Sequence, residues 1–186
     1  MTELSERVEG ATNVLLKAPP MSESQEVGTS LLLAGETKPN VLFVSYTRQP
    51  AACVEQVDGA SVRRVGVITV GEGSGEVEEG VVTATVATPS DLTGLGIEIG
   101  QVLSEWDTPV HISFDSLTSL LQYVDFETAY EFLHAITGQI YAADARAHFH
   151  IDPSAHDDQV VAGIESLFDA SISLDDEPTV RTRDVL

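Results

Sequence analysis

The sequence has little that could cross-link it covalently or hold it in a membrane. Cys53 is the single cysteine in 186 residues, which excludes an internal disulfide and a cysteine-based metal site. No apolar run approaches the roughly 20 residues that span a bilayer. The polar, acidic start MTELSERVEG does not have the pattern of a signal peptide. We therefore expect a cytoplasmic protein that makes no membrane contact.

Basic residues are also scarce. The chain has 9 lysines and arginines against 30 aspartates and glutamates, a formal net charge of -21. Nucleic acids and anionic lipids bind through basic patches, so this balance argues against direct binding to either. Two interpretations of the acidity remain open. It fits adaptation to a salt-rich cytosol, where high ionic strength screens self-repulsion, or an acidic recognition surface for a basic partner.

Apolar runs that alternate with helical patterns predict an α/β protein with a mainly parallel sheet. We expect one domain over residues 13–175, a polar lead-in at 1–12 and a polar tail at 176–186. The glycines and glutamates of 71–80, GEGSGEVEEG, predict a flexible acidic loop. The predicted strands are 13–18, 40–46, 65–70, 81–87, 109–115, 147–152 and 170–174, and the predicted helices are 26–35, 50–57, 91–106, 126–141 and 157–168.

The best-patterned segment is 109–138, PVHISFDSLTSLLQYVDFETAYEFLHAITG. It predicts a buried strand that ends at Asp115, a turn at Ser116, and then an amphipathic helix with Asp125 as its cap. A carboxylate at the end of a buried strand is a position from which a metal ion can be held. What Asp115 faces is therefore the question that decides the chemistry of this protein.

From about Ala11 to Asp175 the order of elements resembles the RecA-like P-loop ATPase core. The likeness is greatest to KaiC-type proteins, including a group seen in halophilic archaea. The motifs that carry it are DSLT at Asp115–Thr118, FLH at Phe132–His134 and the pair Asp152–Pro153. The resemblance implies a three-layer α/β core in which helices flank a mainly parallel sheet on both faces. The acidic composition agrees with a halophilic source.

The phosphate-binding motif of that family is lost. An active member needs GxxxxGK[ST], in which backbone amides wrap the phosphates, lysine bridges them and the hydroxyl holds magnesium. In KAPPMSESQ the glycine positions are Ala18 and Glu23, the lysine position is Ser24 and the hydroxyl position is Gln25. Glu23 and Glu26 place negative charge where polyphosphate would lie. We expect no magnesium–nucleotide cofactor here.

A second departure supports the first. Strands of KaiC-type proteins end in paired glutamates that polarise the attacking water, and Thr47 and Arg48 stand at the corresponding positions. Because both the phosphate-binding motif and the glutamates that would activate water are missing, we do not expect an enzyme. Asp115 and Ser116 remain as a vestigial nucleotide–magnesium site. Asp115 either keeps residual affinity for a divalent cation or serves only as a hydrogen-bond acceptor in the turn.

The segment His148-Phe149-His150-Ile151-Asp152, with His156 beyond it, has the H-x-H-x-D spacing of a zinc hydrolase motif. On a strand, alternate residues project from one face, which suits a metal site made by His148, His150, Asp152 and His156. That motif normally continues with histidine directly after the aspartate, where this chain has Pro153. The alternative is that the histidines are hydrogen-bonded groups of the core.

The resemblance and the lost motifs together predict a pseudo-ATPase, that is, a non-catalytic protein with an ATPase fold. We expect it to act as a regulator or scaffold in signalling or transcription control. We expect a protein partner or a homo- or hetero-oligomer. The predicted contact residues lie in the altered turn (Met21, Glu23, Glu26) and in the acidic loop (Glu76, Glu78). Two alternatives stay open: a weak nucleotide–magnesium sensor or ATPase that uses Asp115, and a metal-dependent hydrolase that uses His148, His150 and Asp152.

Overall fold

The predicted apolar segments form one sheet. The computed structural model describes residues 2–20, 22–35, 37–72 and 77–183. In that part of the chain eight strands pair in the order β4-β3-β2-β5-β6-β1-β7-β8, all parallel except β8. Valine, leucine and isoleucine run through the central strands because both sheet faces are covered. The strands are β1 (Asn13–Lys17), β2 (Asn40–Ser45), β3 (Arg64–Val70), β4 (Val82–Val86), β5 (Val110–Asp115), β6 (Arg146–Ile151), β7 (Ala170–Ser173) and β8 (Thr179–Thr182).

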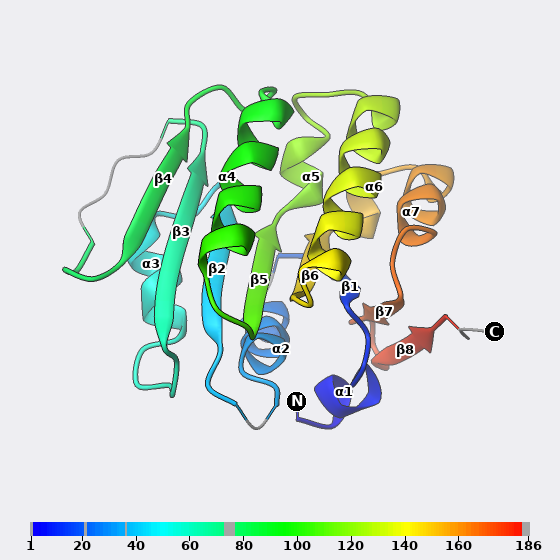
Figure 1. The fold of residues 1–186 in the computed structure, drawn as a ribbon. Coiled ribbons are helices and arrows are strands. Elements are labelled where there is room, and N and C mark those ends of the chain that lie inside the picture. The colour runs from blue at the N-terminus through cyan, green and yellow to red at the C-terminus, as the bar shows by residue number, and fades with distance from the viewer. Residues whose placement is uncertain (1, 21, 36, 73–76, 184–186) are drawn as a thin grey trace.

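Helices cover both faces of the sheet, which confirms the predicted three-layer architecture (Figure 1). On one face a large apolar cluster contains Leu95, Leu133 and Ile164, one from each of three helices. On the other face a smaller cluster contains Leu32 and Cys53. The first face carries α4 (Leu92–Glu105), α5 (Leu117–Leu120), α6 (Phe126–Ala142) and α7 (Asp158–Glu165); the second carries α1 (Thr2–Arg7), α2 (Ser22–Leu32) and α3 (Pro50–Gln56); a short 3₁₀ turn, η1 (Pro153–Ala155), follows β6.

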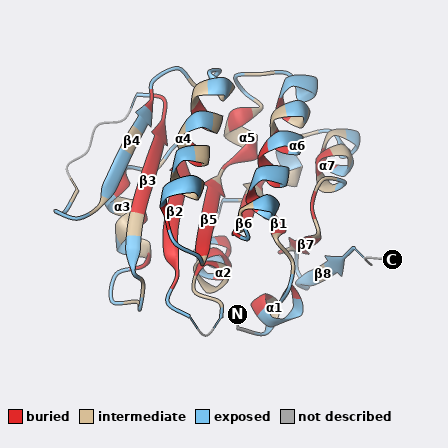
Figure 2. Cartoon of the chain, in the orientation of Figure 1, coloured by how far each residue is buried: buried red, intermediate tan, exposed pale blue. Residues whose placement is uncertain are grey.

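Phe149 lies at the centre of the larger cluster. Its side chain is fully buried, and its ring centroid is 5.0 Å from that of Phe114 on β5 and 5.1 Å from that of Phe168 after α7. Figure 2 shows the buried residues concentrated along the central strands and the inner sides of the helices. Because strand residues alternate between faces, the residues on either side of Phe149 point to the opposite face. Those neighbours are His148 and His150.

The residues after 175 contain a strand that the apolar pattern did not predict. β8 pairs with β7, with Val180 opposite Ile172, inside the predicted tail 176–186. Val180 packs against an apolar cluster formed by residues of β1, β7 and α2, whereas Thr179, Arg181 and Thr182 are exposed. A four-residue edge strand with one inward apolar side chain has too little alternation to be recognised. Residues 73–76 of the predicted acidic loop lie outside the described residues.

The path of the chain opens a crevice at one edge of the sheet. After β1 the chain crosses to β2, and β5 and β6 later fill the space between these two strands. The carboxyl ends of β1, β2, β5 and β6 therefore lie together, at a switch point where α/β proteins bind ligands. Within the described residues no helix combines the length and the apolar character needed to cross a membrane.

Candidate functional site at the carboxyl ends of the strands

A polar cleft of about 580 Å³ lies at these strand ends. Its walls come from the ends of β1, β2, β5 and β6, from the first turns of α2, and from the turn that leads into α5. Its lining includes the cation Arg48 and the carboxylates Asp115 and Asp152. The polar side chains that line it are Ser24, Gln25, Thr47, Arg48, Gln56, Ser113, Asp115, Ser116, Thr118, Ser119, His148, His150 and Asp152.

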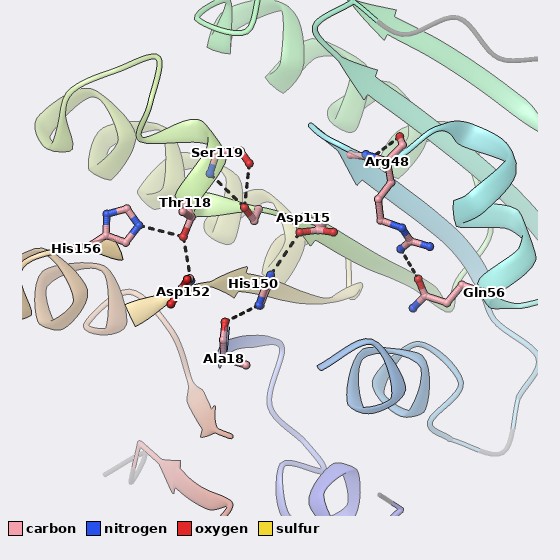
Figure 3. Close-up of polar contacts among 11 residues, drawn as sticks. Ala18, Arg48, Gln56, Asp115, Thr118, Ser119, His150, Asp152 and His156 are labelled. Carbon is pink, nitrogen blue, oxygen red and sulfur yellow. Dashed lines mark hydrogen bonds and ion pairs between the residues drawn. The ribbon is translucent and has the colours of Figure 1, made fainter. Parts of the chain in front are cut away.

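His150 lies between Asp115, the carboxylate of the predicted vestigial site, and Ala18 of the altered phosphate turn (Figure 3). Its Nδ1 lies 3.4 Å from Oδ1 of Asp115, and its Nε2 lies 2.8 Å from the carbonyl oxygen of Ala18. Both partners are hydrogen-bond acceptors, so the ring is best matched when both nitrogens carry protons. Burial lowers the pKa of His150, but the Asp115 carboxylate and the Ala18 carbonyl outweigh it and raise this pKa overall.

This contact answers what Asp115 faces. The pairing of β5 with β6 places Asp115 directly opposite His150, so the strand register itself brings the two side chains together. Ser116 contributes differently, because its Oγ accepts a hydrogen bond from the amide of Ser119, 3.1 Å away, and caps α5. The carboxylate of Asp115 thus has an imidazole as its partner, while Ser116 acts as a helix cap.

Replacing His150 by glutamine is expected to destabilise the protein most at mildly acidic pH. Because the folded-state pKa of His150 is raised, the stabilisation from its protonated form is complete below the unfolded value of about 6.5 and is lost as pH rises through the folded value. Urea unfolding of wild type and His150→Gln at a series of pH values measures this difference. A stability difference that stays constant across that range would contradict a charged pair with Asp115.

His148 lines the same cleft, but its pKa shifts in the opposite direction to that of His150. Its side chain is buried, and burial, followed by the nearby charge of His150, lowers its pKa from 6.5 to about 4. The ring packs against Gly28 in α2, where a Cβ added to the glycine would lie only 3.0 Å from Nε2 of His148. Glycine at position 28 therefore lets α2 approach the sheet closely. His148 is a neutral packing residue of this interface.

Arg48 is held by its own neighbours on the other side of the cleft. Its Nη1 donates to Oε1 of Gln56 at 2.6 Å, and its Nη2 donates to the carbonyl oxygen of Ala52 at 2.7 Å. The backbone of Arg48 exchanges two 2.9 Å hydrogen bonds with the hydroxyl of Ser45. Arg48, which stands where KaiC-type proteins have a glutamate, is thus an ordered cation that is hydrogen-bonded to α3.

Thr118 links the end of β6 to the turn at α5. Its hydroxyl oxygen accepts from the amide of Asp152 at 2.9 Å and lies 3.0 Å from Nε2 of His156. Oδ1 of Asp152 accepts from the amide and hydroxyl of Ser154. Sequence reasoning placed Thr118 in a family motif but had no signal for this role, because its partners lie more than 30 residues further along the chain.

The predicted metal ligands therefore divide into separate contacts. His148 packs on Gly28, His150 bonds Asp115, the carboxylate of Asp152 accepts from Ser154, and the ring of His156 lies beside the Thr118 hydroxyl. In the part of the chain that the structure describes, no three histidine, cysteine or carboxylate side chains converge as a metal ion requires. The zinc site stays a sequence prediction that these contacts do not support.

Three of the predicted interaction residues belong to the described part of the chain, and all three are exposed on the surface. Glu23 and Glu26 are exposed on α2, and Glu78 is exposed before β4. Glu23 lies in the first turn of α2, where a negative charge also stabilises the helix. Met21 and Glu76 lie outside the described residues.

The sheet order, the two helical layers and the cleft at the switch point define an α/β protein of the RecA-like fold. Similar solved structures agree. A KaiC-like protein from Pyrococcus horikoshii has a TM-score of 0.62 at 12% identity, over 94% of this chain and 80% of that one. The flagellar accessory protein FlaH from Methanocaldococcus jannaschii has a TM-score of 0.54 at 9% identity, over 96% and 81%.

A third structure is an uncharacterised protein from Pyrococcus horikoshii in complex with an unknown peptide, with a TM-score of 0.64 and 11% identity over 98% of both chains. At these identities the likeness shows the fold alone. The family is shown by the sequence, because the model of the family of unknown function DUF7504 matches residues 11–174. The chain belongs to that family. The search of curated proteins found no match.

Proposed function

We propose that this protein is a non-catalytic member of the RecA/KaiC-like fold that regulates or scaffolds other proteins through direct contacts. The observation that carries the proposal is the position of His150. Its ring lies between the Asp115 carboxylate and the Ala18 carbonyl, at the place where a phosphate loop and a magnesium ion would have to meet. The imidazole of His150 thus occupies both the Asp115 carboxylate and the Ala18 carbonyl.

The surrounding electrostatics support this proposal. A phosphate loop offers backbone N–H groups and a lysine to the nucleotide, whereas this turn directs the carbonyl oxygen of Ala18 to His150. Glu23 and Glu26 add exposed negative charge on α2. Magnesium needs a near-octahedral set of oxygen ligands, and Gln25 stands where the phosphate loop of KaiC-type ATPases has its hydroxyl ligand. Each departure disfavours polyphosphate and its metal ion.

Titration with ATP or ADP and magnesium in molar KCl is therefore expected to give no saturable heat. In the same buffer, neither nucleotide should raise the thermal unfolding midpoint. A ligand at 100 times its dissociation constant would add about 2.7 kcal/mol to the free energy of unfolding, which is readily detected. Saturable binding that disappears in Asp115→Asn would overturn the proposal and favour a nucleotide sensor.

The partner side of the proposal rests on the charge of the surface. A net charge of -21 suits a partner with a basic contact surface, and one structural neighbour is described in complex with a peptide. A cytoplasmic signalling or transcription-control complex in a salt-rich cell is the setting we propose, by analogy with KaiC-type proteins. Pull-down from a high-salt lysate with wild type and Glu23→Arg as baits tests the altered turn. Identical sets of recovered proteins would exclude this turn as the contact surface.

A further inference from the structure

Among the described residues, the outer edge of β4 pairs with no other strand. β4 is the last strand on its side of the sheet in the described residues, so one row of its backbone groups has no strand partner there. Its sequence, VTATV, contains no charge and no proline, and Val82 is 45% exposed. Edge strands are normally protected by lysine, proline or a bulge, because a bare edge pairs readily with another strand. β4 is therefore suited to accept one.

A groove runs beside this edge. It has a volume of about 230 Å³ and lies between α4 and the face of the sheet formed by β2, β3 and β4. Val82 and Ala84 of β4, with Trp106 at the end of α4, give it an apolar floor, and two carboxylates, Glu98 and Glu105, line it from α4. A strand that pairs with the outer edge of β4 would have one face on the same side of the sheet as α4, and positive charge on that face would complement Glu98 and Glu105.

β8, at the opposite edge of the same sheet, has both properties. It is an exposed edge strand, and it carries Arg181, with Arg183 directly after its end. Arg181 lies opposite Ser171 of β7, whose hydroxyl donates to Glu165 of α7. Because side chains alternate along a strand, Arg183 shares that face with Arg181. Both arginines therefore lie on the face of the sheet that carries α4, α6 and α7.

We propose that β8 of one copy of this chain pairs antiparallel with β4 of a second copy and extends the sheet from molecule to molecule. β8 already runs opposite to β1–β7, so a continued sheet brings it antiparallel to the next β4. The α4 faces of the two copies then coincide, and the arginines of β8 come to lie over the groove that Glu98 and Glu105 line.

The order of the charges matches as well. α4 returns from the end of β4 to the start of β5 (Figure 1). Glu105, the last residue of α4, therefore lies toward the Val82 end of β4, and Glu98 lies further along the strand. An antiparallel β8 brings Arg183 to the Val82 end, beside Glu105, and Arg181 toward Glu98. This register places Ala84 opposite Arg181 and Thr83 opposite Thr182. Such a head-to-tail contact is heterologous and produces rings or filaments.

Pairing of β4 with β4 of a second copy is the main competing arrangement. It would bring Glu98 and Glu105 of both copies toward one another, in molecules that each carry a charge of -21. Like charges in direct opposition are destabilising. The β8–β4 contact brings together opposite charges instead, and it does not depend on the state of the cleft, so it stands or falls separately from the proposed loss of catalysis.

Disulfide cross-linking tests the contact and its register. Thr83→Cys and Thr182→Cys change exposed, uncharged residues, and the native Cys53 is buried. Cα atoms directly opposite on antiparallel strands lie about 4.5–5.5 Å apart, which is within disulfide range. Mild oxidation of a mixture of the two variants is expected to give mixed dimers that neither variant gives alone. Thr83→Cys dimers formed alone, Thr182→Cys dimers formed alone, or an absence of mixed dimers would each overturn the proposal.

Charge reversal provides an independent test. Arg183→Glu and Glu105→Arg are each expected to reduce assembly, measured by sedimentation velocity at about 0.15 M salt, where charges are screened over about 8 Å. Mixing the two variants restores one wild-type contact between each pair of molecules and should recover association. Lys38→Glu, an exposed change away from both edges that alters net charge as Arg183→Glu does, is the control and should leave assembly unchanged. If Lys38→Glu weakens assembly as much as Arg183→Glu, the contact is not at β8.

Discussion

Replacing Phe149 by alanine is expected to lower the free energy of unfolding by about 3–5 kcal/mol, the range for a buried phenylalanine. Phe149 is fully buried and contacts the rings of Phe114 and Phe168, with centroids 5.0 and 5.1 Å away. Removing it leaves a cavity between β5, β6 and the end of α7. Since whole domains are stable by only about 5–15 kcal/mol, this one change removes a large share of the total.

Chemical denaturation monitored by circular dichroism measures this effect. Tyr141→Ala serves as the matched control, because Tyr141 is an aromatic residue that is 72% exposed at the end of α6. A surface substitution of this kind should change stability by no more than about 0.5 kcal/mol. Equal effects of the two substitutions would mean that the aromatic cluster does not form the centre of the core.

The second large effect is acid sensitivity caused by His148. Its folded-state pKa of about 4 lies below the unfolded value of 6.5, so the folded state resists protonation at this position. The neutral ring therefore contributes its full stabilisation above about pH 6.5 and loses it as pH falls toward 4. A difference of roughly 2.5 pKa units corresponds to about 3 kcal/mol over that interval.

His148→Gln removes this titration and keeps a polar side chain of similar length. The free energy of unfolding of the variant should fall less steeply than that of wild type between pH 6.5 and 4, whereas any loss of stability at pH 7 comes from lost packing on Gly28. The titratable groups near His148 are His150, Asp115 and His111, and all three are the same in both proteins. Parallel pH profiles for the two proteins would show that His148 is accessible to protons in the folded state.

Much of the fold could be predicted because its signals are local. The apolar runs of the parallel strands were visible in the sequence, and so was the cap of α6, where the Asp125 side chain accepts from the amide of Thr128 at 2.8 Å. β8 could not be predicted, because the burial of Val180 depends on β7 and on residues of β1 and α2. A short edge strand carries little information of its own.

The site, like the fold, could be predicted only as far as its signals are local in the sequence. The histidine spacing correctly indicated that His148 and His150 share one side of a strand, and both line the cleft. The sequence pattern could not show that Asp115, 35 residues earlier, lies opposite His150, since this pairing depends on the register of β5 against β6. Nor could it show that the pKa of His150 is raised while that of His148, two residues away, is lowered, because Asp115 acts on the first ring and burial on the second.

The contact between His148 and Gly28 also restricts which sequences can adopt this fold. The imidazole occupies the space into which any side chain at position 28 would project, with only 3.0 Å between Nε2 and a Cβ placed there. A residue larger than glycine at position 28 therefore requires the imidazole to move by a few tenths of an ångström, or a smaller side chain at position 148, to keep α2 in its observed position. The two positions, 120 residues apart, are expected to vary as a pair among proteins of this family.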